Sequence, residues 1–129
     1  MNKRRFVITM AGLALTASGA WADCQKKITL IPTGAGVSKG VSGTSVVRAS
    51  GTDQRFRVSM DAHVKNGAMF VVKANGQLAG TITIQLGAGE LDLNTKDGAV
   101  LPPGVNPVCS IGTVSVASPA GITVLNGNF

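Results

Sequence analysis

From Asp23 onward, apolar and polar residues alternate over short stretches that are separated by Gly, Asn, Asp and Pro. A period of two with this punctuation is typical of β-strands joined by turns, and no stretch has the pattern of a long helix. The clearest strand is Gln54 to Asp61, in which Phe56, Val58 and Met60 alternate with polar residues. One face of this strand is therefore expected to pack in a core and the other to face water.

A central hairpin is predicted in the middle of the chain. The apolar run Ala68 to Ala74 is followed by Asn75-Gly76, the strongest short hairpin signal, and then by a return strand from Gln77 to Leu86. Gly87-Ala88-Gly89 is expected to form the next turn. In the return strand, the apolar side chains of one parity are expected to point inward: Leu78, Ile82, Ile84 and Leu86.

The remaining pattern predicts five further strands and one irregular crossing. The strands are expected at Gln25 to Ile31, Ser42 to Ala49, Glu90 to Asn94, Val108 to Val116 and Gly121 to Leu125. Leu101 to Pro107 contains three prolines and cannot donate a regular ladder, so we expect a loop or an edge crossing between sheets there. About seven or eight short strands predict an all-β fold, namely an antiparallel β-sandwich or alternatively a small barrel.

The first 22 residues have the layout of a secretory signal peptide. Lys3, Arg4 and Arg5 form a positive segment, residues 6–17 form a short apolar run, and Ala20-Trp21-Ala22 is a typical cleavage site. The apolar run is too short for the roughly 30 Å hydrocarbon core, which needs about 20 apolar residues, so no transmembrane anchor is expected. Residues 1–22 are thus assigned to a signal peptide and residues 23–129 to one exported all-β domain.

The two cysteines, Cys24 and Cys109, stand near the two ends of the predicted exported chain. An even number of cysteines in an exported protein indicates a disulfide, which in the chain-entropy model stabilises a loop of about 85 residues by roughly 4 to 5 kcal/mol. Metal-binding or redox thiols are the alternative, but the chain has no CxxC spacing and one histidine. We therefore expect Cys24 and Cys109 to be paired.

The charge of the predicted exported chain is weakly basic. The net charge of +6 for the whole sequence includes three cations of the signal peptide, so half of it is lost on processing. The remaining cations are spread along the chain without interleaved aromatics, and no nucleic-acid partner is expected. A basic face could still meet acidic polysaccharide, lipopolysaccharide or an anionic protein of the envelope, although solvated strand faces explain the same charges.

Candidate chemistry is sparse, and no catalytic, cofactor-binding or metal-binding residue is assigned. His63 is the only possible imidazole base and has no nucleophile motif beside it. Met60 and His63, with Met69, could form a soft copper site, but Met60 has the parity of the core. Glu90 and Asp92 share a strand face, as a glycosidase pair would.

Two further motifs resemble ligand sites. Asp92, Asn94 and Asp97-Gly98 resemble a calcium loop with the wrong spacing, and a polar turn is expected instead. Gly34-Ala35-Gly36 has neither a following helix nor a Gly-Lys-Ser/Thr ending, so it does not support phosphate binding.

From Phe56 onward the chain resembles a loosely defined class of small exported bacterial β domains. The resemblance is carried by the Phe56-Val58-Met60 alternation and by three segments: residues 75–81, residues 87–93 and the ending Val124-Leu125-Asn126-Gly127-Asn128-Phe129. It covers about half the chain and implies no active site.

Three functional hypotheses follow. The first is a non-catalytic structural or binding module of the cell envelope or extracellular space. The second is a fimbrial or filament subunit that completes a neighbour's sheet with a terminal strand. The third is an enzyme acting on envelope polysaccharide through Glu90 and Asp92. Expected partners are envelope proteins, polysaccharide or further copies of the chain.

Overall fold

The computed structural model describes residues 23–129, and the predicted signal peptide lies outside the described residues. The described chain is built from antiparallel β-strands, which confirms the all-β prediction. The strands are β3 (Cys24–Pro32), β4 (Ser42–Ser50), β5 (Asp53–Asp61), β6 (Met69–Ala74), β7 (Gln77–Thr83), β8 (Ala88–Asn94), β9 (Thr113–Ala117) and β10 (Thr123–Asn128). The short helices are α1 (Gly34–Ser38) and the 3-10 turns η2 (Lys96–Gly98), η3 (Pro103–Val105) and η4 (Val108–Ser110).

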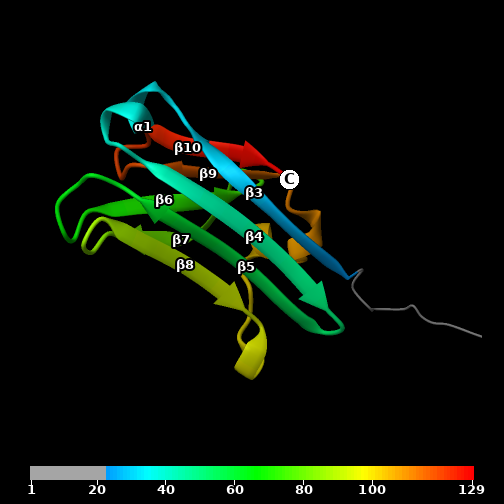
Figure 1. Cartoon of the computed structure of the whole chain (residues 1–129). Coiled ribbons are helices and arrows are strands. Elements are labelled where there is room, and N and C mark those ends of the chain that lie inside the picture. The colour runs from blue at the N-terminus through cyan, green and yellow to red at the C-terminus, as the bar shows by residue number, and fades with distance from the viewer. Residues whose placement is uncertain (1–22) are drawn as a thin grey trace, which may run out of the picture.

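The strands form one curved sheet in the order β7-β6-β9-β10-β3-β4-β5-β8. Figure 1 shows β3, β4, β5 and β8 as one layer and the other four strands behind it. The layers are joined on one side by β10 and β3, which pair at Leu125 with Pro32 and at Asn126 with Ile31. On the other side, β7 and β8 are linked by an isolated bridge between Gln85 and Ala88. The fold is thus a sandwich that is nearly closed like a barrel, in agreement with the two predicted architectures.

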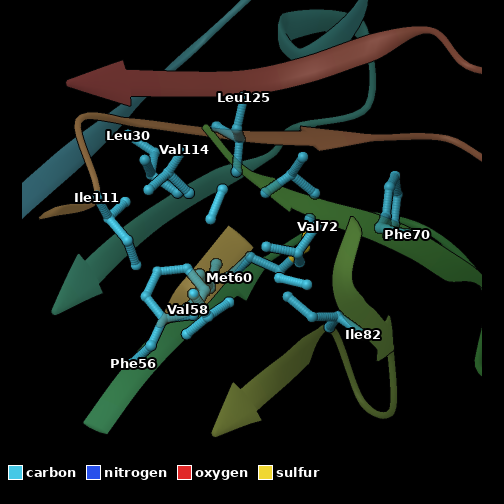
Figure 2. Close-up of a cluster of buried hydrophobic side chains, with 14 of the residues drawn as sticks. Leu30, Phe56, Val58, Met60, Phe70, Val72, Ile82, Ile111, Val114 and Leu125 are labelled. Atoms are coloured by element: carbon cyan, nitrogen blue, oxygen red, sulfur yellow. The ribbon is translucent and has the colours of Figure 1, made fainter. Parts of the chain in front are cut away.

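The core lies between the two layers, where inward side chains of both meet (Figure 2). Phe56 and Val58 of β5 are fully buried and Met60 is 3% exposed, which confirms the predicted inward face of this strand. Val72 of β6 and Leu125 of β10, both fully buried, come from the opposite layer. Burial of these large apolar side chains is the main stabilising contribution to a domain of this size.

The hairpin of β6 and β7 forms at Asn75-Gly76 as predicted. Both residues have positive φ angles, 51° and 79°, as a type I′ turn requires. The inward assignment of Leu78 is wrong, because Lys73 pairs with Leu78 while Val72 pairs with Gly80. This register shift is a β-bulge that turns Ala79 into the core and leaves Leu78 60% exposed.

The inward assignment of Leu86 is also wrong. Strand β7 ends at Thr83, and the turn to β8 is centred on Leu86-Gly87 instead of on the predicted residues 87–89. Gln85 and Ala88 exchange two backbone hydrogen bonds across it, of 2.9 and 3.1 Å. The N–H of Leu86 donates to Asn66 Oδ1 at 2.7 Å, which holds Leu86 at a φ of 54° with its side chain 91% exposed.

The strand predicted from Val108 to Val116 is shorter than expected. Val108–Ser110 is the 3-10 turn η4, because Val108 donates its N–H to Gln54 Oε1 at 2.9 Å and Cys109 is bound to Cys24. These two links hold the segment away from a ladder, and β9 begins at Thr113. The final strand is likewise shifted: Gly121, at a φ of 91°, belongs to a turn, and β10 runs from Thr123 to Asn128.

The two ends of the sandwich differ. At one end, which we call the disulfide end, the irregular segment after β8 turns inward and buries four apolar side chains: Leu101, Val105, Val108 and Ile111. The predicted proline-rich loop is therefore confirmed as an irregular crossing that also seals the core. The opposite end, which we call the helix end, is covered by α1. The expectation that no helix accompanies Gly34-Ala35-Gly36 is therefore wrong, because Thr33 Oγ1 accepts the Gly36 N–H at 3.1 Å and caps this short helix.

Candidate ligand-binding face

The outward side chains of β3, β4, β5 and β8 form one continuous polar surface, which we call the outer face. Strand pairing places these side chains in rows that run across the four strands. The row at the disulfide end is Gln25, Arg48, Arg55 and Asn94, the next is Lys27, Val46, Arg57 and Asp92, and the third is Thr29, Thr44, Ser59 and Glu90.

Two arginines of the first row are direct neighbours. Arg48 of β4 pairs with Arg55 of β5, and like charges directly opposite each other in a sheet lower its stability. Arg55 is compensated by Asp92, whereas Arg48 has no ion pair within the part of the chain that the structure describes. On the outer face, the guanidinium of Arg48, which has no acidic partner among the described residues, therefore lies beside that of Arg55.

A cleft of about 500 Å³ opens beside this arginine pair at the disulfide end. Its lining is polar throughout and consists of Arg48, Ser50, Asp53, Gln54, Arg55, Asn94 and Lys96. Three cations and one carboxylate surround the space, so its potential is positive and favours an anionic group. Planar guanidinium groups are suited to carboxylate, sulfate and phosphate because they donate two parallel hydrogen bonds.

A second cleft, of about 590 Å³, lies on the same outer face toward the helix end. Its polar lining consists of four hydroxyl side chains, Thr29, Ser42, Thr44 and Ser59, and two carboxylates, Asp61 and Glu90. Hydroxyl groups both donate and accept hydrogen bonds. The outer face therefore combines a cationic end with an end lined by hydroxyl groups and carboxylates, and the Arg57 row lies between them.

Ion pairs connect β5 to β8 across the face. Arg55 Nε donates to Asp92 Oδ1 at 2.9 Å, and Arg57 Nε lies 2.7 Å from Glu90 Oε2 without the angle of a hydrogen bond. The hydrogen bond from Arg55 lowers the pKa of Asp92, and the same hydrogen bond together with the negative charge of Asp92 raises the pKa of Arg55. All four side chains remain 28% to 45% exposed, so these pairs fix orientation more than they add stability.

Glu90 and Asp92, the carboxylates considered for glycoside hydrolysis, are brought to one face as expected. Each is engaged by an arginine, Asp92 by Arg55 and Glu90 by Arg57. A general acid in such a reaction needs a raised pKa, whereas that of Asp92 is lowered by Arg55. The arrangement therefore suits ion pairs that orient charged side chains on a binding surface better than it suits carboxylates that transfer protons.

The residues considered for copper do not converge. Met60 is buried in the core, whereas Met69 is 47% exposed and His63 is also exposed. The His63 imidazole packs against Gly40, where an added Cβ would come within 2.6 Å of Nδ1. Met60 belongs to the core face of β5, which explains why it alternates with polar residues in the sequence.

The residues considered for calcium and phosphate have local structural roles. Asn94 Oδ1 accepts the N–H of Lys96 at 3.1 Å and so closes a turn, while Asp92 pairs with Arg55 on the strand. Gly36 lies in α1 under β10, where a Cβ would come within 2.0 Å of the Val124 carbonyl oxygen. Among the described residues, no three His, Cys, Asp or Glu side chains are grouped as metal ligands would be.

The predicted disulfide is present between Cys24 and Cys109, whose Cα atoms are 5.9 Å apart. It ties the start of β3 to η4 and so anchors the irregular segment at the disulfide end. Disulfides persist in oxidising compartments, which indicates an environment outside the reducing cytoplasm.

The outer face could be found from sequence only in part. The parity of Arg55 and Arg57 in β5 indicates an outward pair, but the neighbourhood of Arg48, Arg55 and Lys96 depends on strand pairing.

Comparisons with protein-family models, with curated proteins and with solved structures find no match. Within residues 23–129, none of the helices is long and apolar enough to cross a membrane.

Proposed function

We propose that the protein is an exported, non-catalytic binding module of the bacterial cell envelope or extracellular space, and that its outer face binds an anionic polymer such as acidic polysaccharide. The observation that carries this proposal is the placement of Arg48 directly opposite Arg55, with Lys96 on the same cleft. A sheet retains facing arginines at a cost to its stability, and an anionic ligand would offset that cost.

Export is supported by two independent features. The sequence begins with a segment of signal-peptide composition, and the Cys24–Cys109 disulfide indicates an oxidising compartment. The second cleft, beyond the Arg57 row, offers hydroxyl groups and the carboxylates of Asp61 and Glu90, which suit the hydroxyl groups of an elongated polysaccharide, while its anionic groups are expected at the arginine pair. The enzyme alternative is less favoured, because the hydrogen bond from Arg55 lowers the pKa of Asp92 and so stabilises its charged form.

The proposal is tested by isothermal titration of the processed protein with an oligogalacturonate, which carries carboxylates, and with a neutral maltooligosaccharide of equal length. The variant Arg48→Ser with Lys96→Ser removes two cations from the cleft. The matched control, Lys65→Ser with Lys73→Ser, removes two exposed cations from outside the outer face.

We expect the acidic sugar to bind and the neutral one not to. The cleft variant should lose about tenfold or more in affinity, which corresponds to about 1.4 kcal/mol, while the control changes little. Equal losses in both variants would show that net charge alone attracts the polymer, and absence of binding by the wild type would reject this ligand class.

A further inference from the structure

Two strand edges of the β3-β4-β5-β8 layer have no neighbouring strand near the disulfide end. Strand β3 pairs with β4 from Cys24 to Leu30, whereas on its other side its pairing with β10 is limited to Ile31 and Pro32. Gly127 of β10 still lies against Ile28, Thr29 and Leu30, so the uncovered part of this side is the start of β3. Strand β8 pairs with β5 on one side, and toward β7 the described ladder is limited to the Gln85–Ala88 bridge. The layer therefore ends in two open edges that lie at the same end of the molecule (Figure 1).

The hydrogen bonds at the strand ends identify the residues whose backbone groups point out from the β3 edge. Thr33 N–H donates to the Val124 carbonyl at 3.0 Å, so Thr33 and every second residue before it face the β10 side of β3. Strand β3 pairs with β4 without a register shift from Cys24 to Leu30, so its backbone groups alternate between the two sides along this whole range. Because Gly127 of β10 lies beside the Thr29 carbonyl, the open edge of β3 consequently presents the N–H and C=O groups of Gln25 and Lys27.

The same alternation identifies the open edge of β8. Thr95 N–H donates to the Gln54 carbonyl at 3.0 Å and Ala62 N–H to the Gly87 carbonyl at 2.9 Å. Odd-numbered residues of β8 therefore bond to β5, and even-numbered residues point away from it. The β8 edge thus presents the backbone groups of Glu90, Asp92 and Asn94.

These two edges are complementary in direction, register and charge. Strands alternate in direction across the layer, so β3 of a second copy would continue it as an antiparallel neighbour of β8. When the cross-strand rows of the outer face continue into the second copy, Lys27 of that copy lies opposite Asp92. Positive and negative side chains then alternate across the junction in the order Arg57, Asp92, Lys27. On the inner side it places Ile28 beside Leu91, two apolar residues that are only partly buried within one copy.

We propose that the occupant of each open edge is a second copy of this chain, with the β8 edge of one molecule pairing with the β3 edge of the next. The contact joins two different surfaces, so it leaves a free edge at each end and generates an open chain of molecules instead of a closed dimer. Lysine on an edge strand normally opposes such pairing, but here Lys27 meets the carboxylate of Asp92.

This mode of assembly differs from donation of a terminal strand. Strand β10, which contains most of the C-terminal segment, is already paired with β9 on one side and with the end of β3 on the other. Val124 and Leu125 of β10 are fully buried in their own core. Edge pairing requires no strand to leave its own sheet.

The test is sedimentation velocity of the processed, oxidised protein over a wide concentration range at low salt. Lys27→Pro blocks the edge while sparing the ladder with β4, because the N–H of Lys27 points away from β4. Lys27→Asp instead places a carboxylate opposite Asp92 of the neighbouring copy. Lys65→Asp makes the same charge change on the exposed loop between β5 and β6 and serves as the control.

We expect the sedimentation coefficient of the wild type and of Lys65→Asp to rise with concentration and to fall when salt is added. Both Lys27 variants should lose this rise and keep the melting temperature of the folded monomer. A wild type that stays monomeric at the highest concentration would overturn the proposal, and so would assembly of both Lys27 variants at the wild-type level. The variant Arg48→Ser with Lys96→Ser should assemble normally, which separates this proposal from anion binding.

Discussion

The side-chain amide of Gln54 holds the backbone of Val108, although the two residues are 54 positions apart. Oε1 of Gln54 accepts the buried N–H of Val108 at 2.9 Å, and Nε2 donates to Asn106 Oδ1 at 3.2 Å. Gln54 is 5% exposed and has the inward parity of β5. Because η4 is not paired with a strand, the Val108 N–H has no backbone acceptor in a β-ladder, and the Gln54 amide takes that place. The amide thereby connects β5 to the irregular segment that seals the disulfide end.

Replacing Gln54 by Ala should destabilise the protein by about 1–3 kcal/mol, because the buried N–H of Val108 would lose its acceptor. The free energy of unfolding, measured by urea denaturation, checks this. Gln25→Ala, on the exposed side of β3, is the matched control and should change stability little. Equal effects of the two substitutions would contradict a specific role for the Gln54 amide.

Removing the disulfide should lower the free energy of unfolding by up to roughly 4 to 5 kcal/mol, because the unfolded chain would regain the freedom of a loop of about 85 residues. The measurement is urea denaturation of the wild type with and without reductant. The double variant Cys24→Ala with Cys109→Ala should unfold at the same low urea concentration whether or not reductant is present. Insensitivity of the wild type to reduction would contradict a stabilising role.

Two glycines of α1 should respond differently to the same substitution. Gly36→Ala would place a Cβ within 2.0 Å of the Val124 carbonyl oxygen, so α1 would have to move from β10, at a cost of about 1–3 kcal/mol. Gly34→Ala meets no atom within 4 Å and should be neutral or slightly stabilising, since alanine favours a helix. Thermal unfolding of both variants tests this contrast, and a greater loss for Gly34→Ala would contradict the close approach of α1 to β10.

The ion pair of Arg55 and Asp92 should contribute to acid sensitivity. The pKa of Asp92 is lowered in the folded state by the hydrogen bond from Arg55, so its contribution to stability is present above the unfolded pKa of about 3.9. It is lost as the pH falls through the lower, folded pKa. Asp92→Asn should therefore flatten the decline in stability at acid pH, as measured by urea denaturation at a series of pH values.

The control for this prediction is Asp61→Asn. Asp61 is an exposed residue at the end of β5 and has no ion pair among the residues that the structure describes. Its substitution should leave the acid limb of the pH profile close to that of the wild type. A direct NMR titration of the Asp92 carboxyl would show a pKa below the usual range, and a normal or raised value would contradict the pairing with Arg55.

Local patterns by themselves determined several features of this protein. The alternation around Phe56 determined which face of β5 enters the core, and Asn75-Gly76 determined the β6–β7 turn, because both depend on neighbouring residues only. With two cysteines in the chain, the Cys24–Cys109 pairing had no competitor. The all-β class follows from the same period of two.

The tertiary structure decided the features that depend on partners distant in sequence. Ala79 enters the core in place of Leu78 because of a bulge opposite β6, and Val108 leaves the strand pattern because Gln54 and the disulfide hold its segment. The same holds for the outer face and the two open edges, since alternation shows that Arg48 and Arg55 point outward but not that they lie side by side. A residue's parity is a property of its own strand, whereas its neighbours across the sheet are set by register, which forms only when strands pair.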